Sequence, residues 1–177
     1  RIAAKQMVRY TKDFSDFKPT LKQSNEEIVN LVYKPVHNFL EHCEYTTSID
    51  INPHYIKPNG MMYRLMKATH EYGAGTATFY MTSSKSLEMV MDLLKTMRED
   101  CEKMAAADLH ELMRAWEIIH RIWTVEAHLR HIQFRKETRY PGFYYQSDFP
   151  GQDDENWFCF VNSKYDPENN TWDIFKK

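Results

Sequence analysis

The sequence contains little glycine and no long apolar run. Its five glycines, among 177 residues, form neither a G-x-G-x-x-G motif nor a P-loop. No loop of this chain is therefore expected to cradle the phosphates of a nucleotide or dinucleotide. No apolar run approaches the roughly 20 residues that a membrane-spanning helix needs, so membrane insertion is not expected.

Cysteine is also scarce. Cys43, Cys101 and Cys159 lie far apart, and no two of them form a C-x-x-C pair. An odd, scattered set is typical of a reducing compartment, and no signal peptide is recognisable, so we expect a cytoplasmic protein. The formal net charge is only −2, which argues against a strong overall attraction to nucleic acid or to anionic membranes.

A long helical segment that begins near Asp108 organises the chain. Asp108 is a good N-cap, and Glu111 stands three residues later, as in a capping box. No glycine or proline interrupts the segment before Pro141, which predicts a helix of about thirty residues, on the order of 45 Å long. The spacing places Trp116 and Trp123 on its apolar face, and we expect both in the core. The full predicted face is Leu109, Leu112, Met113, Trp116, Ile119, Trp123, Ala127 and Phe134.

Shorter amphipathic segments are expected to pack on this helix. They are predicted over residues 1–12, from Ser24 onward with Glu27 completing a cap, over 60–72 and over 84–104. The last segment should form an antiparallel hairpin with the long helix, because the connection between them is short. Residues 76–82 are ambiguous between helix and strand. The predicted buried residues are Met62, Leu65, Met66 and Thr69 in 60–72, and Leu87, Val90, Met91, Leu94, Met97 and Cys101 in 84–104.

The composition changes after residue 140. Eleven of the 25 aromatic residues lie between Tyr140 and Phe175, and turn-forming residues 166–170 separate two strand-like runs, 157–161 and 171–175. We interpret this region as a small hairpin or an extended arm that lies on the bundle. It holds seven acids and three bases, which disfavours nucleic-acid binding. The predicted fold class is all-α: a helical bundle built on one long helix, with an irregular, aromatic-rich C-terminal arm.

Histidines in a helical bundle raise the alternative of a self-sufficient metal enzyme. Glu117 and His120 form one Glu-x-x-His pair, whereas a di-iron bundle needs two. His128 and His131 are three residues apart, but no cysteine or second histidine pair is spaced to complete a site. We therefore assign no catalytic and no metal-binding residue in this chain.

Basic residues recur every seven positions along the long helix. On a helix this spacing forms a nearly straight stripe, which is either a solvated face or a docking face for an acidic surface. We adopt the docking face as a hypothesis, because only one nearby acid, Glu117, alternates with the bases. The candidate interface comprises Arg114, Arg121, His128 and Arg135, flanked by His131 and extended by Arg139 if the helix continues.

Two segments carry a resemblance to a known family. EAHLRHIQFRKETRYPGFYYQSDFP (126–150) and DDENWFCFVNSKYDP (153–167) resemble the C-terminal part of the alpha subunits of dissimilatory adenylylsulfate reductases. These belong to the wider flavoprotein family of succinate dehydrogenase, fumarate reductase and L-aspartate oxidase. The wider family carries Glu-Ser-Arg-Gly after its long helix, whereas residues 137–142 here read Glu-Thr-Arg-Tyr-Pro-Gly. The local geometry is therefore not carried over from succinate dehydrogenase.

The resemblance covers nearly the whole chain and implies a function. It implies the C-terminal helical domain of a flavin-dependent subunit whose enzyme reduces adenylylsulfate to AMP and sulfite. FAD is then expected in the rest of the subunit and [4Fe–4S] clusters in an iron–sulfur beta subunit, with neither bound by this chain alone. The expected partners are the flavin and capping domains of the same subunit and the beta subunit.

The resemblance also implies a division of the chain. Residues 1–18 are expected to trail from the flavin domain, 19–139 to form the helical bundle, and 140–177 to form the arm. The alternative function is a helical protein-interaction module with no link to redox chemistry.

Overall fold

The computed structural model describes residues 2–13, 22–45, 51–139 and 144–177. The chain divides into two compact units, Arg1–Val32 and Tyr33–Lys177, which we describe separately. The first contains helix α1 (Ile2–Asp13) and the start of helix α2 (Asn25–His42). The cap predicted before α2 is confirmed. The Ser24 N–H donates to Glu27 Oε2 at 2.7 Å, and the Glu27 N–H donates to Ser24 Oγ at 3.2 Å.

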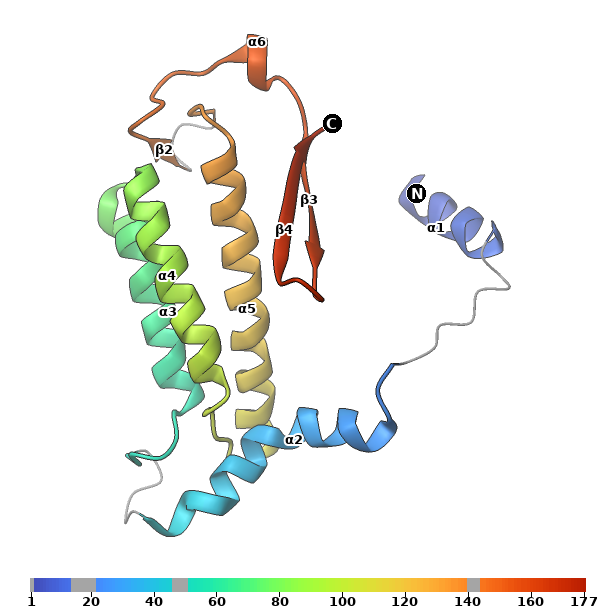
Figure 1. Ribbon diagram of the computed structural model, residues 1–177, viewed down its shortest axis with the longest axis vertical. Coiled ribbons are helices and arrows are strands. Elements are labelled where there is room, and N and C mark those ends of the chain that lie inside the picture. Colours follow the sequence, from blue (N-terminus) through green and yellow to red (C-terminus); the bar gives the residue numbers. More distant parts are fainter. Residues whose placement is uncertain (1, 14–21, 46–50, 140–143) are drawn as a thin grey trace. The chain divides into compact units, whose positions relative to one another are not determined.

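Three helices form the body of the second unit and lie side by side (Figure 1). They are α3 (Pro58–Tyr72), α4 (Ser84–Cys101) and α5 (Leu109–Phe134). The α5 helix begins where predicted, because Asp108 Oδ1 accepts a hydrogen bond from the Glu111 N–H at 2.8 Å. It ends earlier than predicted, after 26 residues, because Arg135 adopts an extended conformation with ψ 102°.

The core-facing side of α5 differs from the predicted one. Leu109 is 70 % exposed and Met113 is 60 % exposed, while Trp116 and Trp123 are only half-buried. The prediction that both tryptophans lie in the core was therefore wrong. The α5 helix carries apolar residues around much of its circumference, and its buried residues are smaller than its two tryptophans. The apolar residues of α5 that are buried are Leu112, Ala115, Ile118, Ile122, Leu129 and Ile132.

The buried face of α3 differs from the predicted one, whereas the buried face of α4 agrees with the prediction. In α3 the buried residues include Met61 and Ala68, and of the predicted set only Leu65 is fully buried. In α4 the buried residues are Leu87, Val90, Leu94 and Met97, as predicted, with Met91 and Cys101 half-buried. Burial raises the pKa of the Cys101 thiol to about 11, so this cysteine is an inert packing residue. The antiparallel hairpin of α4 and α5 is confirmed (Figure 1).

The ambiguous segment 76–82 contains a short 3-10 helix, η2 (Thr76–Thr78), and a two-residue strand, β1 (Met81–Thr82). Strand β1 pairs in parallel with β2 (Tyr145–Gln146) at the start of the arm. Between η2 and β1, Phe79 and Tyr80 have positive φ angles of 51° and 63°. The sequence did not predict this pairing, which fixes the arm beside the beginning of α4.

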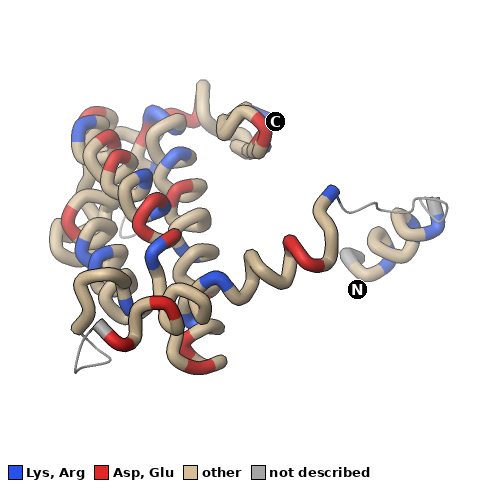
Figure 2. The backbone as a smooth tube through the Cα atoms, turned by 60° about the horizontal axis from the view of Figure 1, so that its bottom comes forward, with Lys and Arg blue, Asp and Glu red and all other residues tan. Residues whose placement is uncertain are grey.

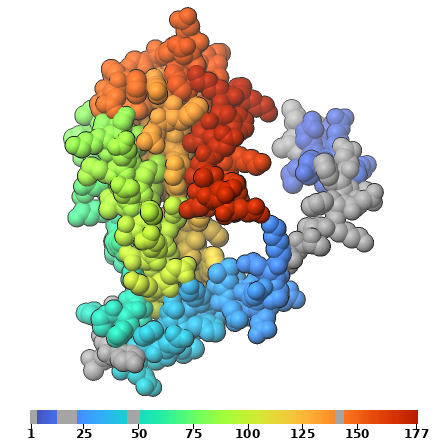
Figure 3. Space-filling view, in the orientation of Figure 1, coloured from blue at the N-terminus to red at the C-terminus, as the bar shows by residue number. Residues whose placement is uncertain are grey.

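The C-terminal arm contains a short helix and a hairpin. Helix α6 covers Asp154–Trp157, and β3 (Val161–Asp166) pairs antiparallel with β4 (Thr171–Lys176). The hairpin interpretation is therefore confirmed, with its turn at the predicted residues, although the first strand begins at Val161 and not at Trp157. The arm covers one end and one side of the bundle (Figure 3).

Charged residues of both signs are intermingled along the helices (Figure 2). In the described parts of the chain, no helix combines the length and the low polarity that crossing a bilayer requires.

Candidate functional site

A buried carboxylate anchors the arm just beyond the end of α5. Glu137 is fully buried, and its Oε1 accepts hydrogen bonds from Arg135 Nη1 at 2.6 Å and Arg139 Nε at 2.7 Å. Its Oε2 accepts from Arg139 Nη2 and from the Asp153 N–H, both at 2.9 Å. A buried carboxylate would be costly if unpaired, but two guanidinium groups and a backbone donor satisfy this one.

The protonation of this cluster follows from its contacts. Burial alone would raise the pKa of Glu137, but hydrogen bonds from Arg139, the Asp153 backbone and Arg135 outweigh it and lower this pKa. The Glu137 carboxylate in turn raises the pKa of Arg139. The cluster is therefore fully ionised at neutral pH.

Arg135 also clamps the backbone of the arm. Its Nη1 donates to the Trp157 carbonyl at 2.9 Å and its Nη2 to the Cys159 carbonyl at 2.8 Å. Behind it, the buried Gln146 turns its amide nitrogen toward the Ile132 and Arg135 carbonyls, at 3.2 and 2.9 Å. Gln146 thereby supplies a donor to the Ile132 carbonyl in the last turn of α5, and a second donor to the Arg135 carbonyl, which also accepts from the Glu137 N–H.

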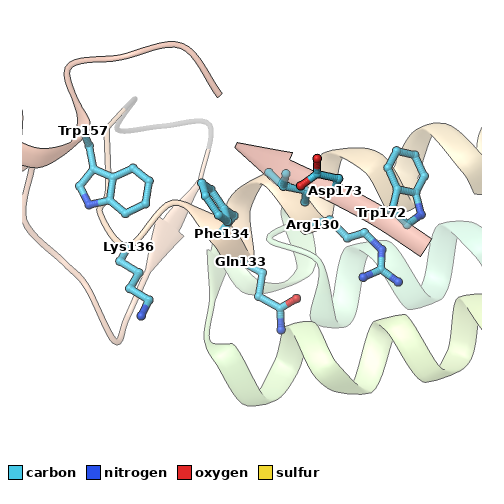
Figure 4. A pocket seen from close by; sticks show the side chains of 8 residues that line it. Arg130, Gln133, Phe134, Lys136, Trp157, Trp172 and Asp173 are labelled. Carbon is cyan, nitrogen blue, oxygen red and sulfur yellow. The ribbon is translucent and has the colours of Figure 1, made fainter. Parts of the chain in front are cut away.

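Two grooves flank Trp157. The first, of about 720 Å³, lies between the end of α5 and strand β4, with Trp157 and Trp172 at its two ends (Figure 4). Arg130 and Lys136 supply its positive charge and Asp173 its negative charge. The second groove, of about 520 Å³, is lined by His131, Arg135, Arg139, Lys177 and the backbone-clamped residues 157–161. Among the described residues, no acidic side chain lines this second groove.

The structure brings three of the six candidate interface residues together. His131, Arg135 and Arg139 all line the second groove. Arg139 reaches it through the turn after Phe134, since α5 does not continue to residue 139. Burial and then the charge of Arg135 lower the pKa of His131, so this ring is neutral at pH 7.

The other three candidates lie along α5, away from this groove. The side chain of Arg121 is half exposed and pairs with Glu117. Arg114 is exposed, and its Nε donates to His110 Nε2 at 2.9 Å. His128 is also exposed by surface area. The unbroken stripe of the sequence is thus divided into an exposed part on the helix and a part at its end that is bound to Glu137.

Sequence reasoning missed a second buried carboxylate, Glu126. It is 2 % exposed, and it pairs with Arg98 of α4 and Arg130 of α5 at 2.7 and 2.8 Å. Arg98 in turn lies over the Trp123 ring, 4.8 Å from its centroid. The spacing of Glu126 and Arg130, four residues apart on a helix, signals an ion pair, but nothing in the sequence points to Arg98 as a partner.

Comparison with known proteins identifies the relatives of this chain. No protein-family model matches it. Over all 177 residues it is 50 % identical to the alpha subunit of adenylylsulfate reductase from Megalodesulfovibrio gigas. The whole chain is therefore similar to the C-terminal part of an adenylylsulfate reductase alpha subunit. It matches the C-terminal part of that relative and spans 27 % of its length.

Solved structures of adenylylsulfate reductases have the same fold. The enzyme from Archaeoglobus fulgidus superposes with a TM-score of 0.89 and 47 % identity, over 99 % of this chain and 27 % of that chain. An adenosine-5-phosphosulfate reductase in complex with sulfite, as a covalent adduct, gives the same values. The Mycobacterium smegmatis Sdh1 complex in the apo form, 14 % identical, gives a TM-score of 0.59 over 93 % of this chain and 26 % of that chain, which shows a shared fold alone.

Proposed function

We propose that this chain is the C-terminal helical domain of a flavin-dependent adenylylsulfate reductase alpha subunit, with structural and docking roles. The whole enzyme would reduce adenylylsulfate with two electrons to AMP and sulfite in the cytoplasm. The observation that carries the proposal is the 50 % identity over every residue of the chain to an adenylylsulfate reductase alpha subunit. The alternative, an interaction module unrelated to redox chemistry, has no such support.

The residues of this chain do not fit the cofactors that the family implies. The sequence has no glycine-rich phosphate loop. Across the described ranges, no three His, Cys, Asp or Glu side chains are grouped so that they would hold a metal ion. We therefore assign FAD to the rest of the subunit and the [4Fe–4S] clusters to an iron–sulfur beta subunit.

We propose a division of the chain into segments and contacts with the rest of the subunit and with the beta subunit. Residues 1–18 would lead from the flavin domain into the bundle of residues 19–139, and residues 140–177 would be the arm. The flavin and capping domains of the same subunit would pack on the domain, and the beta subunit would dock on the same subunit. The exposed part of the basic stripe, with Arg114 and Arg121, suits an acidic surface on such a partner.

A reconstitution experiment tests the proposal. The full-length subunit that contains this chain would be coexpressed with its iron–sulfur partner and supplied with adenylylsulfate and a chemical electron donor. We expect bound FAD and the release of AMP and sulfite in equal amounts. A complex that contains flavin and iron but releases no sulfite would contradict the proposed activity. A full-length protein without flavin would favour the interaction module.

A further inference from the structure

Two phenylalanines in the second groove are almost fully exposed. Phe158 is 83 % exposed and Phe160 is 81 % exposed, and both line the groove that also contains His131 and Lys177. A buried phenylalanine ring removes on the order of 150–250 Å² from water. Two such rings in one groove form an apolar patch of the kind that marks a binding surface.

The protein holds the backbone that carries these two rings in place. Arg135 binds the carbonyls on either side of Phe158, those of Trp157 and Cys159. The backbone of Phe160 is paired with that of Lys177 in both directions, through hydrogen bonds of 2.8 and 3.3 Å. The backbone of the patch is therefore ordered before any partner arrives, which lowers the entropic cost of docking.

The groove offers little free charge, although four basic residues line it. Arg135 and Arg139 are saturated by Glu137, and Arg139 also pairs with Asp154 at 2.8 Å. A surface recognised by charge would present unpaired guanidinium groups, whereas here Arg135 and Arg139 hold the arm. The patch is therefore suited to permanent apolar contact more than to electrostatic steering.

We propose that Phe158 and Phe160 are apolar anchors that pack against the part of the same alpha subunit that lies outside this chain. This inference rests on the proposed function, because the covering surface belongs to the remaining length of the subunit. The chain spans 27 % of its relative's length, so most of such a subunit is available to cover the patch. A covalently connected surface covers the rings at all times, whereas a separate partner would leave them in water until it binds.

Hydroxyl-radical footprinting of the full-length alpha subunit, without its partner, tests this inference. The oxidation rate of each ring would be compared with that of the same ring in the urea-unfolded subunit. Because docked interfaces exclude water, we expect a fall of about tenfold at Phe158 and Phe160. A fall of less than twofold would overturn the inference. Protection that appears only with the iron–sulfur subunit, or only at high protein concentration, would also overturn it and would assign the patch to that subunit or to a second copy.

Substitutions give a second, independent measurement. Phe158→Ala with Phe160→Ala should speed tryptic cleavage of the arm in the folded full-length subunit by about tenfold, since local opening exposes it. Phe158→Leu with Phe160→Leu keeps both positions apolar, so its rate of tryptic cleavage should match that of the wild type. Phe79→Ala is the matched control, because Phe79 is 84 % exposed and lies outside the groove. Equal effects of the control and the double variant would count against a specific contact. Neither measurement requires catalytic activity, so failure of the proposed reaction would be recognised separately.

Discussion

Trp123 of α5 meets Tyr165 of β3 edge to face, with their ring centroids 4.8 Å apart. Trp172 of β4 stands 6.3 Å from Trp123 on the same side. Trp123 is therefore the main ring through which the hairpin contacts the bundle. We expect Trp123→Ala to destabilise the protein by about 2 kcal/mol, less than a fully buried Trp would, and to loosen the hairpin before the core.

Hydrogen exchange measures this effect. Amides of β3 and β4 should lose protection in Trp123→Ala, while amides of α4 keep theirs. Trp116→Ala is the control, since Trp116 is also half-buried but its ring pairs with His120 of the same helix. Equal loss in the hairpin for both variants would show that Trp123 has no special part in holding it.

Substitution by alanine should have opposite effects on stability at Gly75 and at Gly60. A Cβ at Gly75 would lie 2.3 Å from the Cα of His70 and 2.9 Å from the Thr69 carbonyl oxygen, both backbone atoms that cannot move aside cheaply. Nothing lies within 4 Å of a Cβ at Gly60, inside α3. We expect Gly75→Ala to lower the free energy of unfolding by about 1–3 kcal/mol through overpacking. We expect Gly60→Ala to raise it by about 0.5–1 kcal/mol. Thermal unfolding of both variants checks the pair, and similar shifts in the two would contradict it.

Acid should release the arm before the bundle. The pKa of Glu137 in the folded protein lies below its usual value of 4.5. Its contribution to stability is therefore complete above about pH 4.5 and is lost as the pH falls through the lowered folded value. Glu137→Gln removes the carboxylate partner of Arg135 and leaves Arg139 with only the exposed Asp154. We therefore expect a loss of about 3 kcal/mol of stability at pH 7 and a weaker dependence of stability on acid pH.

Urea unfolding at a series of pH values tests this expectation. Glu155→Gln is the control, because Glu155 is an exposed acid of the same arm. A Glu137→Gln variant with wild-type stability at pH 7, or with an unchanged acid transition, would show that the cluster does not anchor the arm.

The basic stripe is best tested at Arg114 and Arg121. Arg135→Glu would break the Glu137 cluster, so its effect on binding would be confounded with unfolding of the arm. Arg114→Glu with Arg121→Glu changes two exposed cations outside that cluster. If the stripe is an interface, the association rate with the beta subunit should fall and its dependence on salt should weaken. Unchanged rates at low and high salt would leave the solvated face as the better interpretation.

The sequence predicted where the helices lie better than it predicted which side of each helix is buried. Asp108 with Glu111 marked the start of α5 because a cap is a local interaction between residues three apart. The buried face of α5 was not predictable in the same way, because apolar residues surround the helix and the buried Glu126 interrupts the periodic pattern on the core side. Its partner Arg98 lies on another helix, and such long-range pairing leaves no local signal. The Glu137 cluster was not predictable from the sequence either. Arg135 and Arg139 can both reach Glu137 because α5 ends at Phe134, and the sequence did not predict that end.

The parallel contact between β1 and β2 has a consequence for the order in which the chain folds. The Ser147 hydroxyl donates to the Thr82 carbonyl at 3.0 Å across 65 residues, and Asp148 Oδ2 accepts from the Ser84 N–H at 2.6 Å. The first turn of α4 thus has a hydrogen-bond partner, Asp148, that follows α5 in the sequence. On the ribosome this contact closes only after α5 and the start of the arm have been synthesised. A nascent chain that ends before residue 147 would therefore lack both of these hydrogen bonds at the start of α4.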